Sequence, residues 1–342
     1  MTVTPIHLLS GFLGSGKTTL LNHVVDYYKA QDIKAAIIMN ELGDVNLDGQ
    51  FVDQAVPMAE MLSGCICCTI RGDLSIELKE LIEEHRPDVV IIESTGAANP
   101  MEIIDAITEA TLFMRIDLRT IATVVDGPEL LARSKRGGRT FKLMQDQIRC
   151  ATDLIVNKAD KLAPEELVEV QQLVRELNAY APLTVTVRCM TQLDMFDLKA
   201  APKTKPDANE KRQHDSVSEH VCGANCNHDH GHGHDHDHDQ ADGYVSHAHV
   251  MTLTHYIAGP VNSHAFEALI KNLPQEVYRA KGIVTFTDTN SRFLFQYAYR
   301  EVEFIRITPQ GNVSDVAVFI GEHFAKDVLE KELAKIEDPY WE

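Results

Sequence analysis

Basic residues are few in this chain relative to acidic ones. Its 342 residues include 32 lysines and arginines against 51 aspartates and glutamates, a formal net charge of −19. Because nucleic acids are bound through a basic surface, we expect no nucleic-acid partner. No apolar run approaches the roughly 20 residues of a membrane-spanning helix, and the first residues lack the basic region of a signal peptide. We therefore expect no membrane partner and no secretion.

Cysteine is also scarce, and its arrangement argues against a disulfide framework. The chain has seven cysteines, an odd number, and three of them lie within four positions as Cys65, Cys67 and Cys68. Clustered thiols are more often metal ligands or catalytic groups, as expected in a reducing compartment. We therefore expect a cytoplasmic protein.

Short apolar runs alternate with helical patterns over the first 198 residues. Strands are predicted at 5–10, 34–40, 88–94, 120–127, 153–160 and 182–187, and helices at 17–29 and 164–180. Continuous apolar strands that alternate with amphipathic helices are typical of a parallel sheet covered on both faces. The sequence thus predicts an α/β domain over 1–198.

The composition changes after residue 198. Residues 199–245 lose the apolar periodicity and become rich first in Lys and Pro and then in Asp and His, which predicts a flexible linker. Regular patterns return over 246–342. Helices are predicted at 262–273 and 321–336, and strands at 281–287, 292–298 and 301–307. Strands bracketed by helices predict a smaller α+β domain with an antiparallel sheet.

The segment "GFLGSGKT", residues 11–18, follows a predicted strand and opens a predicted helix. It matches the phosphate-binding loop (P-loop), whose glycines let backbone N–H groups turn onto phosphate oxygens at a helix N-terminus. We expect Lys17 at the β- and γ-phosphates and the Thr18 hydroxyl on Mg²⁺. The expected nucleotide-binding residues are Gly11, Gly14, Ser15, Gly16, Lys17, Thr18 and Thr19. The alternative is a plain glycine turn.

A second motif, "NKAD" at 157–160, ends a predicted strand, where ligands gather in α/β sheets. It resembles the guanine-reading motif of GTPases, in which Asn157, Lys158 and Asp160 would face the base. The Asp160 carboxylate would accept hydrogen bonds from guanine N1 and N2, which adenine cannot donate in the same way. We therefore favour GTP over ATP; the alternative is a surface turn after a strand.

Two more segments lie where γ-phosphate sensors would be expected. "IIESTG" places Glu93 and Gly96 at the end of a predicted strand, the position of an acidic residue near Mg²⁺ and a glycine at the γ-phosphate. The loop 40–49 corresponds to a first switch, with Glu41 the best placed acidic residue to face a metal. Lys17 and Glu93 are the expected catalytic residues. No Gln or Arg presents itself to position the attacking water, which predicts slow intrinsic hydrolysis.

Cys65, Cys67 and Cys68 lie in the sequence between these two switch segments. Soft thiolates select Zn²⁺ or Cu(I), and two or three thiolates with an exchangeable donor suit zinc. C-x-C-C is too compact for every thiol to be an ideal ligand, so Glu41 or a partner chain is expected as a further donor. The alternatives are a buried thiol cluster and a permanent structural zinc.

In order, "GFLGSGKTT", "NELG", "GCICC", "ESTG" and "NKAD" resemble the CobW-like family of P-loop GTPases, which is similar to the metal-delivering GTPases of hydrogenase and urease maturation. The resemblance extends to "RAKGIV" and "VFIGEHF" near the C-terminus. It implies a P-loop NTPase sheet and a GTP-dependent metallochaperone, with zinc the commonest metal and cobalt or iron in some branches. The chain departs from the family in Leu42, where many members have Phe. It also shows no clear serine-alanine-lysine motif after residues 182–187.

A second group of potential ligands lies at 222–239, with two cysteines and six histidines alternating with acids. Such a tract binds divalent ions without one fixed geometry; the alternative is a solvated linker. Cys150 and Cys189 are expected in the core.

The preferred hypothesis is a GTPase that carries Zn²⁺ to a client apo-metalloprotein through its C-terminal domain. A homodimer that depends on nucleotide or metal is compatible with this hypothesis. The alternatives are a cobalt or iron insertion factor of the nitrile hydratase activator or cobalamin type, a His-rich metal buffer, and an ATP-dependent P-loop kinase.

Overall fold

The structure is a computed structural model that describes residues 3–41, 56–62, 69–198, 250–289, 291–298, 300–308 and 313–337. Within these ranges the side chains of 40, 41, 59–62 and 69–73 are not described. The chain divides into one unit of 1–199 with 247–342 and a second unit of 200–246. Nearly all of the predicted linker at 199–245 falls in the second unit, and the linker lies outside the described residues.

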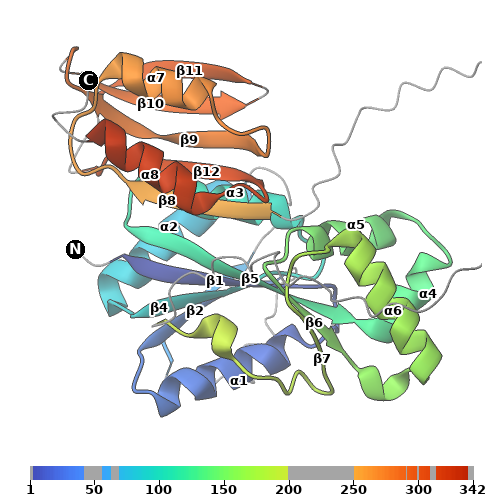
Figure 1. The fold of residues 1–342 in the computed structure, drawn as a ribbon. Coiled ribbons are helices and arrows are strands. Elements are labelled where there is room, and N and C mark those ends of the chain that lie inside the picture. Colours follow the sequence, from blue (N-terminus) through green and yellow to red (C-terminus); the bar gives the residue numbers. More distant parts are fainter. Residues whose placement is uncertain are drawn as a thin grey trace, which may run out of the picture. The chain divides into compact units, whose positions relative to one another are not determined.

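The first sheet has seven strands in the order β3-β2-β4-β1-β5-β6-β7, and every pairing in it is parallel (Figure 1). The strands are β1 (Thr4–Ser10), β2 (Ala35–Glu41), β3 (Met58–Leu62), β4 (Val89–Glu93), β5 (Ile116–Asp126), β6 (Asp153–Asn157) and β7 (Leu183–Val185). The predicted parallel sheet is confirmed. Strand β3, which the apolar pattern did not predict, adds one edge.

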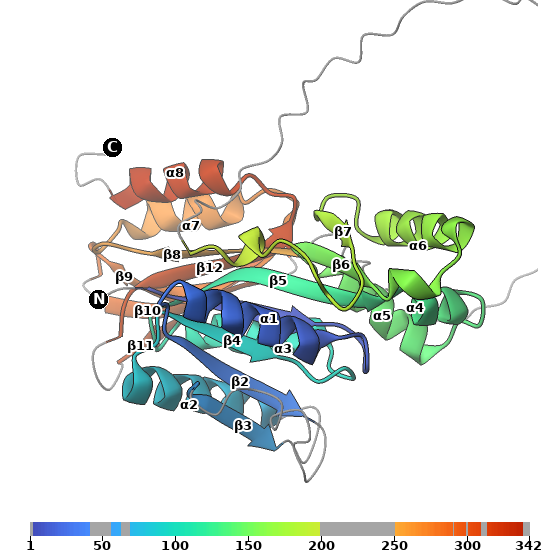
Figure 2. The ribbon, with the colours of Figure 1, turned by 90° about the horizontal axis from the view of Figure 1, so that it is seen from below.

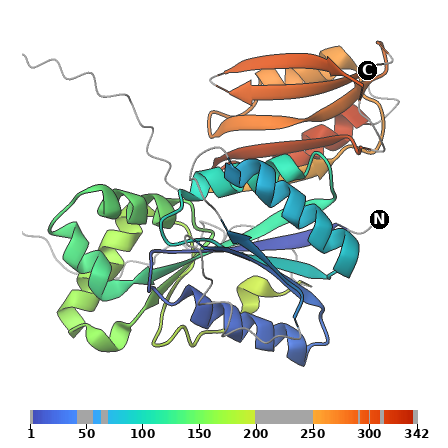
Figure 3. The ribbon, with the colours of Figure 1, turned by 180° about the vertical axis from the view of Figure 1, so that it is seen from behind.

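Helices cover both faces of this sheet (Figures 1 and 2). They are α1 (Lys17–Ala30), α2 (Thr69–His85), α3 (Pro100–Ala110), α4 (Gly127–Ser134), α5 (Arg139–Arg149) and α6 (Pro164–Leu177), with short 3₁₀ turns η2 (Ala159–Lys161) and η3 (Asp194–Phe196). Helices α2 and α3 pack against one another (Figure 3). Helices α4, α5 and α6 contact one another beside β5, β6 and β7 (Figure 2).

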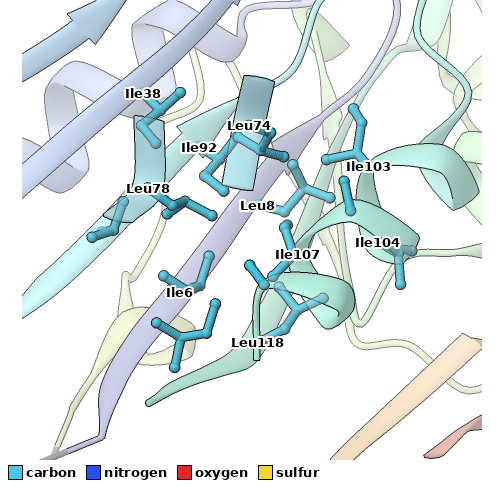
Figure 4. Close-up of a cluster of buried hydrophobic side chains, with 14 of the residues drawn as sticks. Ile6, Leu8, Ile38, Leu74, Leu78, Ile92, Ile103, Ile104, Ile107 and Leu118 are labelled. Carbon is cyan, nitrogen blue, oxygen red and sulfur yellow. The ribbon is translucent and has the colours of Figure 1, made fainter. Parts of the chain in front are cut away.

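The alternation of side chains along β1 explains why both faces are filled. Ile6 and Leu8 join a cluster with α2 and α3, shown in Figure 4, whereas Leu9 joins the cluster that contains Leu20 of α1. Successive side chains of a strand point to opposite faces, so a continuous apolar run can serve two helical layers. This packing fixes the strand ends, and with them the loops that carry the site.

The C-terminal part forms a five-stranded antiparallel sheet with the order β11-β10-β9-β12-β8. Its elements are β8 (Val250–Tyr256), α7 (Ser263–Lys271), β9 (Val277–Phe286), β10 (Ser291–Ala298), β11 (Glu301–Ile307), β12 (Val316–Glu322) and α8 (Lys326–Glu337). Side chains of α7 and α8, such as Phe266 and Leu333, share a core with strand residues such as Phe295 and Phe319. The predicted α+β fold is confirmed.

One predicted boundary in this part was wrong. A helix was expected from residue 321, but Val316–Glu322 is a strand between β9 and β8, and α8 begins only at Lys326. A Cβ on Gly321 would lie 2.3 Å from the backbone oxygen of Glu276, so this residue is fixed by close strand packing. Short apolar runs such as "VAVFI" fit a buried strand or a buried helix equally well in sequence.

Among the described residues, no helix combines the length and apolar character needed to cross a bilayer.

Candidate nucleotide-binding site

The P-loop runs from the end of β1 to the start of α1, and its glycines allow the turn. Gly11, Gly14 and Gly16 have φ of 135°, 70° and 115°, values that residues with a Cβ rarely adopt. A Cβ on Gly11 would also lie 2.2 Å from the Val124 oxygen, and one on Gly16 would lie 2.5 Å from Asn157 Nδ2. The loop therefore packs directly against β5 and β6. Gly11 and Gly16 need glycine for both conformation and space, and Gly14 needs it for conformation alone.

The N-terminus of α1 is arranged to accept an anion. Its N-cap is Gly16, so no side chain caps the first backbone N–H groups, and the first turn contains no acidic residue. Ser15 is fully buried, and its Oγ has no hydrogen-bond partner among the described residues. Lys17 is 7% exposed, and its Nζ donates to the Phe12 oxygen at 3.3 Å. Uncapped amides, a buried hydroxyl and an ammonium group together fit the oxygens of a phosphate.

Thr18 and Glu93 meet at the carboxyl ends of β1 and β4. The Thr18 hydroxyl donates to Glu93 Oε1 at 2.8 Å. Glu93 is 5% exposed, and its backbone pairs with Leu9 of β1 and Met39 of β2. Hydroxyl and carboxylate oxygens are the donors that Mg²⁺ prefers. The structure thus brings the Thr18 and Glu93 oxygens together beside the P-loop, and this donor pair would suit a magnesium ion.

The loop after β4 lies against the P-loop. Ser94 donates to the Leu9 oxygen from both its N–H and its Oγ, each at 3.0 Å. A Cβ on Gly96 would lie 2.3 Å from the Leu13 nitrogen. Asn99 then begins α3 by accepting a hydrogen bond from the Met101 N–H, with Pro100 in the first turn. The predicted γ-phosphate sensor is therefore next to the predicted phosphate loop.

The NKAD segment is tied to the P-loop by Asn157. This residue is 3% exposed, and its Nδ2 donates to the Ser15 oxygen at 2.8 Å. Lys158 has a φ of 62°, and its Nζ lies 2.5 Å from Asp126 Oδ2 at the end of β5. Asp160, in the turn η2, is exposed. The structure thus brings the two motifs together across 142 positions of sequence and leaves the expected base-reading carboxylate accessible.

Sequence reasoning missed the loop that follows β7. The Cys189 N–H donates to Asn157 Oδ1 at 3.0 Å, and its thiol lies 3.4 Å from the Gly16 oxygen. Burial raises the pKa of Cys189 to about 12, so the thiol remains protonated at neutral pH. The expected core location of Cys189 is confirmed, but this residue also supports the P-loop. The predicted strand at 182–187 was the one signal that could have led to this loop, because β7 pairs with β6.

Two family models match this chain. Residues 5–185 match the CobW/HypB/UreG nucleotide-binding domain. The chain belongs to the CobW/HypB/UreG family. Residues 250–337 match the CobW C-terminal domain, which corresponds to the antiparallel sheet with α7 and α8. The resemblance inferred from the motifs is confirmed.

Two curated relatives of this family member share about a third of their residues with it over the aligned part. The "Zinc-regulated GTPase metalloprotein activator 1" of Dictyostelium discoideum is 30% identical over 58% of this chain and 50% of its own length. The "Zinc chaperone YeiR" of Escherichia coli is 33% identical over 50% of this chain and 51% of its own length. The chain thus spans about half the length of these relatives. Zn(II)-bound YjiA GTPase from E. coli, a solved structure, is 21% identical over 98% of this chain with a TM-score of 0.45.

Of the zinc ligands expected for this CobW-family chain, the structure describes only the backbone of Glu41. Cys65, Cys67 and Cys68 lie outside the described residues, as does the side chain of Glu41. The backbone of Glu41 ends β2 and pairs with Leu62, the last residue of β3. In the described ranges, no three His, Cys, Asp or Glu side chains form a metal-binding group. Cys150 is buried, burial raises its pKa, and its expected place in the core is confirmed.

Proposed function

We propose that this chain hydrolyses GTP and uses the presence of the γ-phosphate to control the binding of Zn²⁺ at Cys65, Cys67 and Cys68. The contact of Thr18 with Glu93 carries the proposal, because it joins the end of the P-loop to the strand that enters the sensor loop. Membership of the CobW/HypB/UreG family supports both halves of the proposal. The zinc-related names of its relatives supply the choice of metal.

The described residues take the following roles in the nucleotide reaction. The P-loop amides and Lys17 bind the phosphates, and Asp160 accepts hydrogen bonds from guanine. Thr18 and Glu93 would hold Mg²⁺, which when bound would neutralise charge on the phosphate oxygens. Gly96 offers its backbone N–H to the γ-phosphate. No described side chain takes the role of general base, so we expect slow hydrolysis by the isolated protein, with turnover below about 1 s⁻¹.

Strand pairing supports a link between nucleotide and metal. Glu93 pairs with Met39, two residues before Glu41, and Glu41 pairs with Leu62, three residues before Cys65 in the sequence. A movement at Glu93 can therefore pass through paired strands to the end of β3, which the cysteine motif follows in the sequence. We propose that the GTP-bound form assembles the zinc site and that hydrolysis loosens it.

Delivery completes the proposed function. Zinc released after hydrolysis would pass to a client apo-metalloprotein bound by the C-terminal domain, and two copies of the chain could share the metal site. Cobalt or iron as the cargo is the alternative within the same class. A metal buffer is the alternative from another class, and it is favoured by the six histidines at 222–239.

Zinc titration in two nucleotide states tests the proposal. The protein with residues 222–239 deleted is titrated with Zn²⁺ in the presence of a non-hydrolysable GTP analogue or GDP. We expect tighter binding with the analogue, and loss of that difference in Cys67→Ser. Cys150→Ala is the matched control, because this buried thiol lies in the core. Equal zinc affinity in both nucleotide states would favour the metal-buffer alternative. Tighter binding of Co²⁺ or Fe²⁺ than of Zn²⁺ would indicate that cobalt or iron is the metal carried.

A further inference from the structure

One buried polar side chain beside the nucleotide site has no role in the reaction as described above. Gln147 of α5 is 1% exposed, and its Nε2 donates to the backbone oxygen of Gly96 at 3.2 Å. The two residues are 51 positions apart in sequence. Gly96 belongs to the loop that reads the γ-phosphate, so Gln147 contacts that loop from the side of α5.

Gln147 is itself firmly held. Its backbone oxygen accepts a hydrogen bond from Thr123 Oγ1 of β5 at 3.0 Å. Just beyond it, the oxygens of Ile148 and Ala151 accept hydrogen bonds from the Nδ2 of the buried Asn178 at 2.9 and 3.0 Å. The end of α5 is therefore fixed to the sheet and to the chain after α6. A side chain anchored in this way can fix the position of a neighbouring loop.

Gly96 is confined on its other side by the P-loop. A Cβ at this position would lie 2.3 Å from the nitrogen and 2.7 Å from the Cα of Leu13. The glycine is buried, and its carbonyl points to Gln147. Because the carbonyl of Gly96 is held, rotation of this residue about its backbone bonds is restricted. Its own N–H, which the γ-phosphate would use, belongs to the preceding peptide and is joined to the held carbonyl through the Gly96 Cα. Because Leu13 confines that Cα and Gln147 holds the carbonyl, fewer directions are open to this N–H.

The surroundings strengthen this hydrogen bond. Gln147 lines a small pocket in which apolar side chains such as Phe12, Met144 and Ile148 outnumber the polar ones, Thr123 and Asp126. A hydrogen bond among apolar groups is electrostatically stronger than one in water, and loss of the donor leaves a buried carbonyl unsatisfied. An apolar residue of similar length at position 147 would therefore free the peptide between Gly96 and Ala97 to turn.

We infer that Gln147 is a positioning residue that holds Gly96 in the orientation required to recognise the γ-phosphate. The inference rests on the proposed role of Gly96 as the sensor. GDP lacks the group that Gly96 reads, so removal of the Gln147 amide changes the binding of GTP and leaves that of GDP intact. Loss of one buried hydrogen bond predicts a reduction of about 5- to 10-fold in affinity for a GTP analogue.

The test compares Gln147→Leu with Gln145→Leu, the same substitution on the same helix at a half-exposed position. Affinities for a non-hydrolysable GTP analogue and for GDP are measured by calorimetry, with Gln147→Met as a second variant in case leucine disturbs the fold. Normal GDP affinity verifies that the site is folded. We expect the preference for the GTP analogue over GDP to fall about 5- to 10-fold in both position-147 variants and to be unchanged in Gln145→Leu.

The results separate this inference from the proposal beneath it. If the wild-type protein prefers the GTP analogue and Gln147→Leu keeps that full preference, Gln147 is not a positioning residue and Gly96 can still be the sensor. The same conclusion applies if both nucleotides lose affinity equally. If Gly96→Ala, which would press on Leu13, leaves the wild-type preference intact, the sensor role fails and the inference fails with it.

Discussion

Replacement of Asn157 by alanine tests whether the base-reading motif also holds the P-loop. Asn157 Nδ2 donates to the Ser15 oxygen at 2.8 Å, and its Oδ1 accepts from the Cys189 N–H at 3.0 Å. Each buried hydrogen bond contributes about 1–1.5 kcal/mol, and each backbone group left unsatisfied adds to the loss. We therefore expect Asn157→Ala to lower the free energy of unfolding by about 2–4 kcal/mol.

Asn178→Ala provides a matched control for that loss of stability. Asn178 is also fully buried, and its Nδ2 bonds the backbone oxygens of Ile148 and Ala151, away from the P-loop. Chemical denaturation should show a loss for Asn178→Ala at least as large as that for Asn157→Ala, because Asn178 Oδ1 also accepts from the Ala181 N–H at 3.0 Å. GDP affinity should fall more than about tenfold only in Asn157→Ala, because only there do two loops of the nucleotide site lose their link. Equal GDP affinity in the two variants would refute the reasoning.

Three further predictions concern other parts of the site and the core. Thr18→Val removes the hydroxyl that bonds Glu93 and should raise the Mg²⁺ concentration for half-maximal hydrolysis about 10- to 100-fold, whereas Thr18→Ser should stay near wild type. Asp126→Asn removes the charge beside Lys158 but keeps an oxygen to cap α4. GTP affinity should fall about fivefold, since a partly exposed ion pair contributes up to about 1 kcal/mol; no change would show that Lys158 needs no such partner. Burial, with a smaller contribution from Arg119, lowers the pKa of His7 to about 3. The folded state therefore keeps His7 neutral while the unfolded chain is protonated below its ordinary pKa of 6.5, so stability is complete above pH 6.5 and falls toward pH 3 by up to about 1.4 kcal/mol per pH unit. The melting temperature of His7→Leu should fall less than that of the wild type as the pH is lowered from 6.5 toward 3. An equal fall in the two proteins would contradict the lowered pKa of His7.

The P-loop domain could be predicted because its strands are continuous apolar runs bounded by motifs. "DVVIIES" and "DLIVNKAD" each become a strand that ends at a predicted site residue, Glu93 and Asn157. In a parallel sheet the carboxyl ends of neighbouring strands meet at one edge, so the order of motifs in the chain already implied their proximity. The contacts of Thr18 with Glu93 and of Asn157 with Ser15 confirm that proximity.

Other features left too weak a signal in the sequence. Strand β3 is a short edge strand, and "VAVFIGE" fits a buried helix as well as a buried strand. Gln147 lies in a helix rich in polar residues, and only the tertiary packing of α5 against the sensor loop shows that this glutamine is buried. Cys189 reaches Asn157 through an irregular loop in which Arg188 and Cys189 both have positive φ. Contacts of this kind depend on side-chain geometry and leave no period in the sequence.

The coupling of zinc release to a single round of GTP hydrolysis is the most direct test of the central claim. Protein loaded with Zn²⁺ and GTP is mixed with Mg²⁺ in the presence of a fluorescent zinc chelator, and phosphate release is followed in parallel. We predict that zinc reaches the chelator at the rate of phosphate release and stays bound when GTP is replaced by a non-hydrolysable analogue. Zinc that appears at the same rate with GTP and with the analogue would contradict the account.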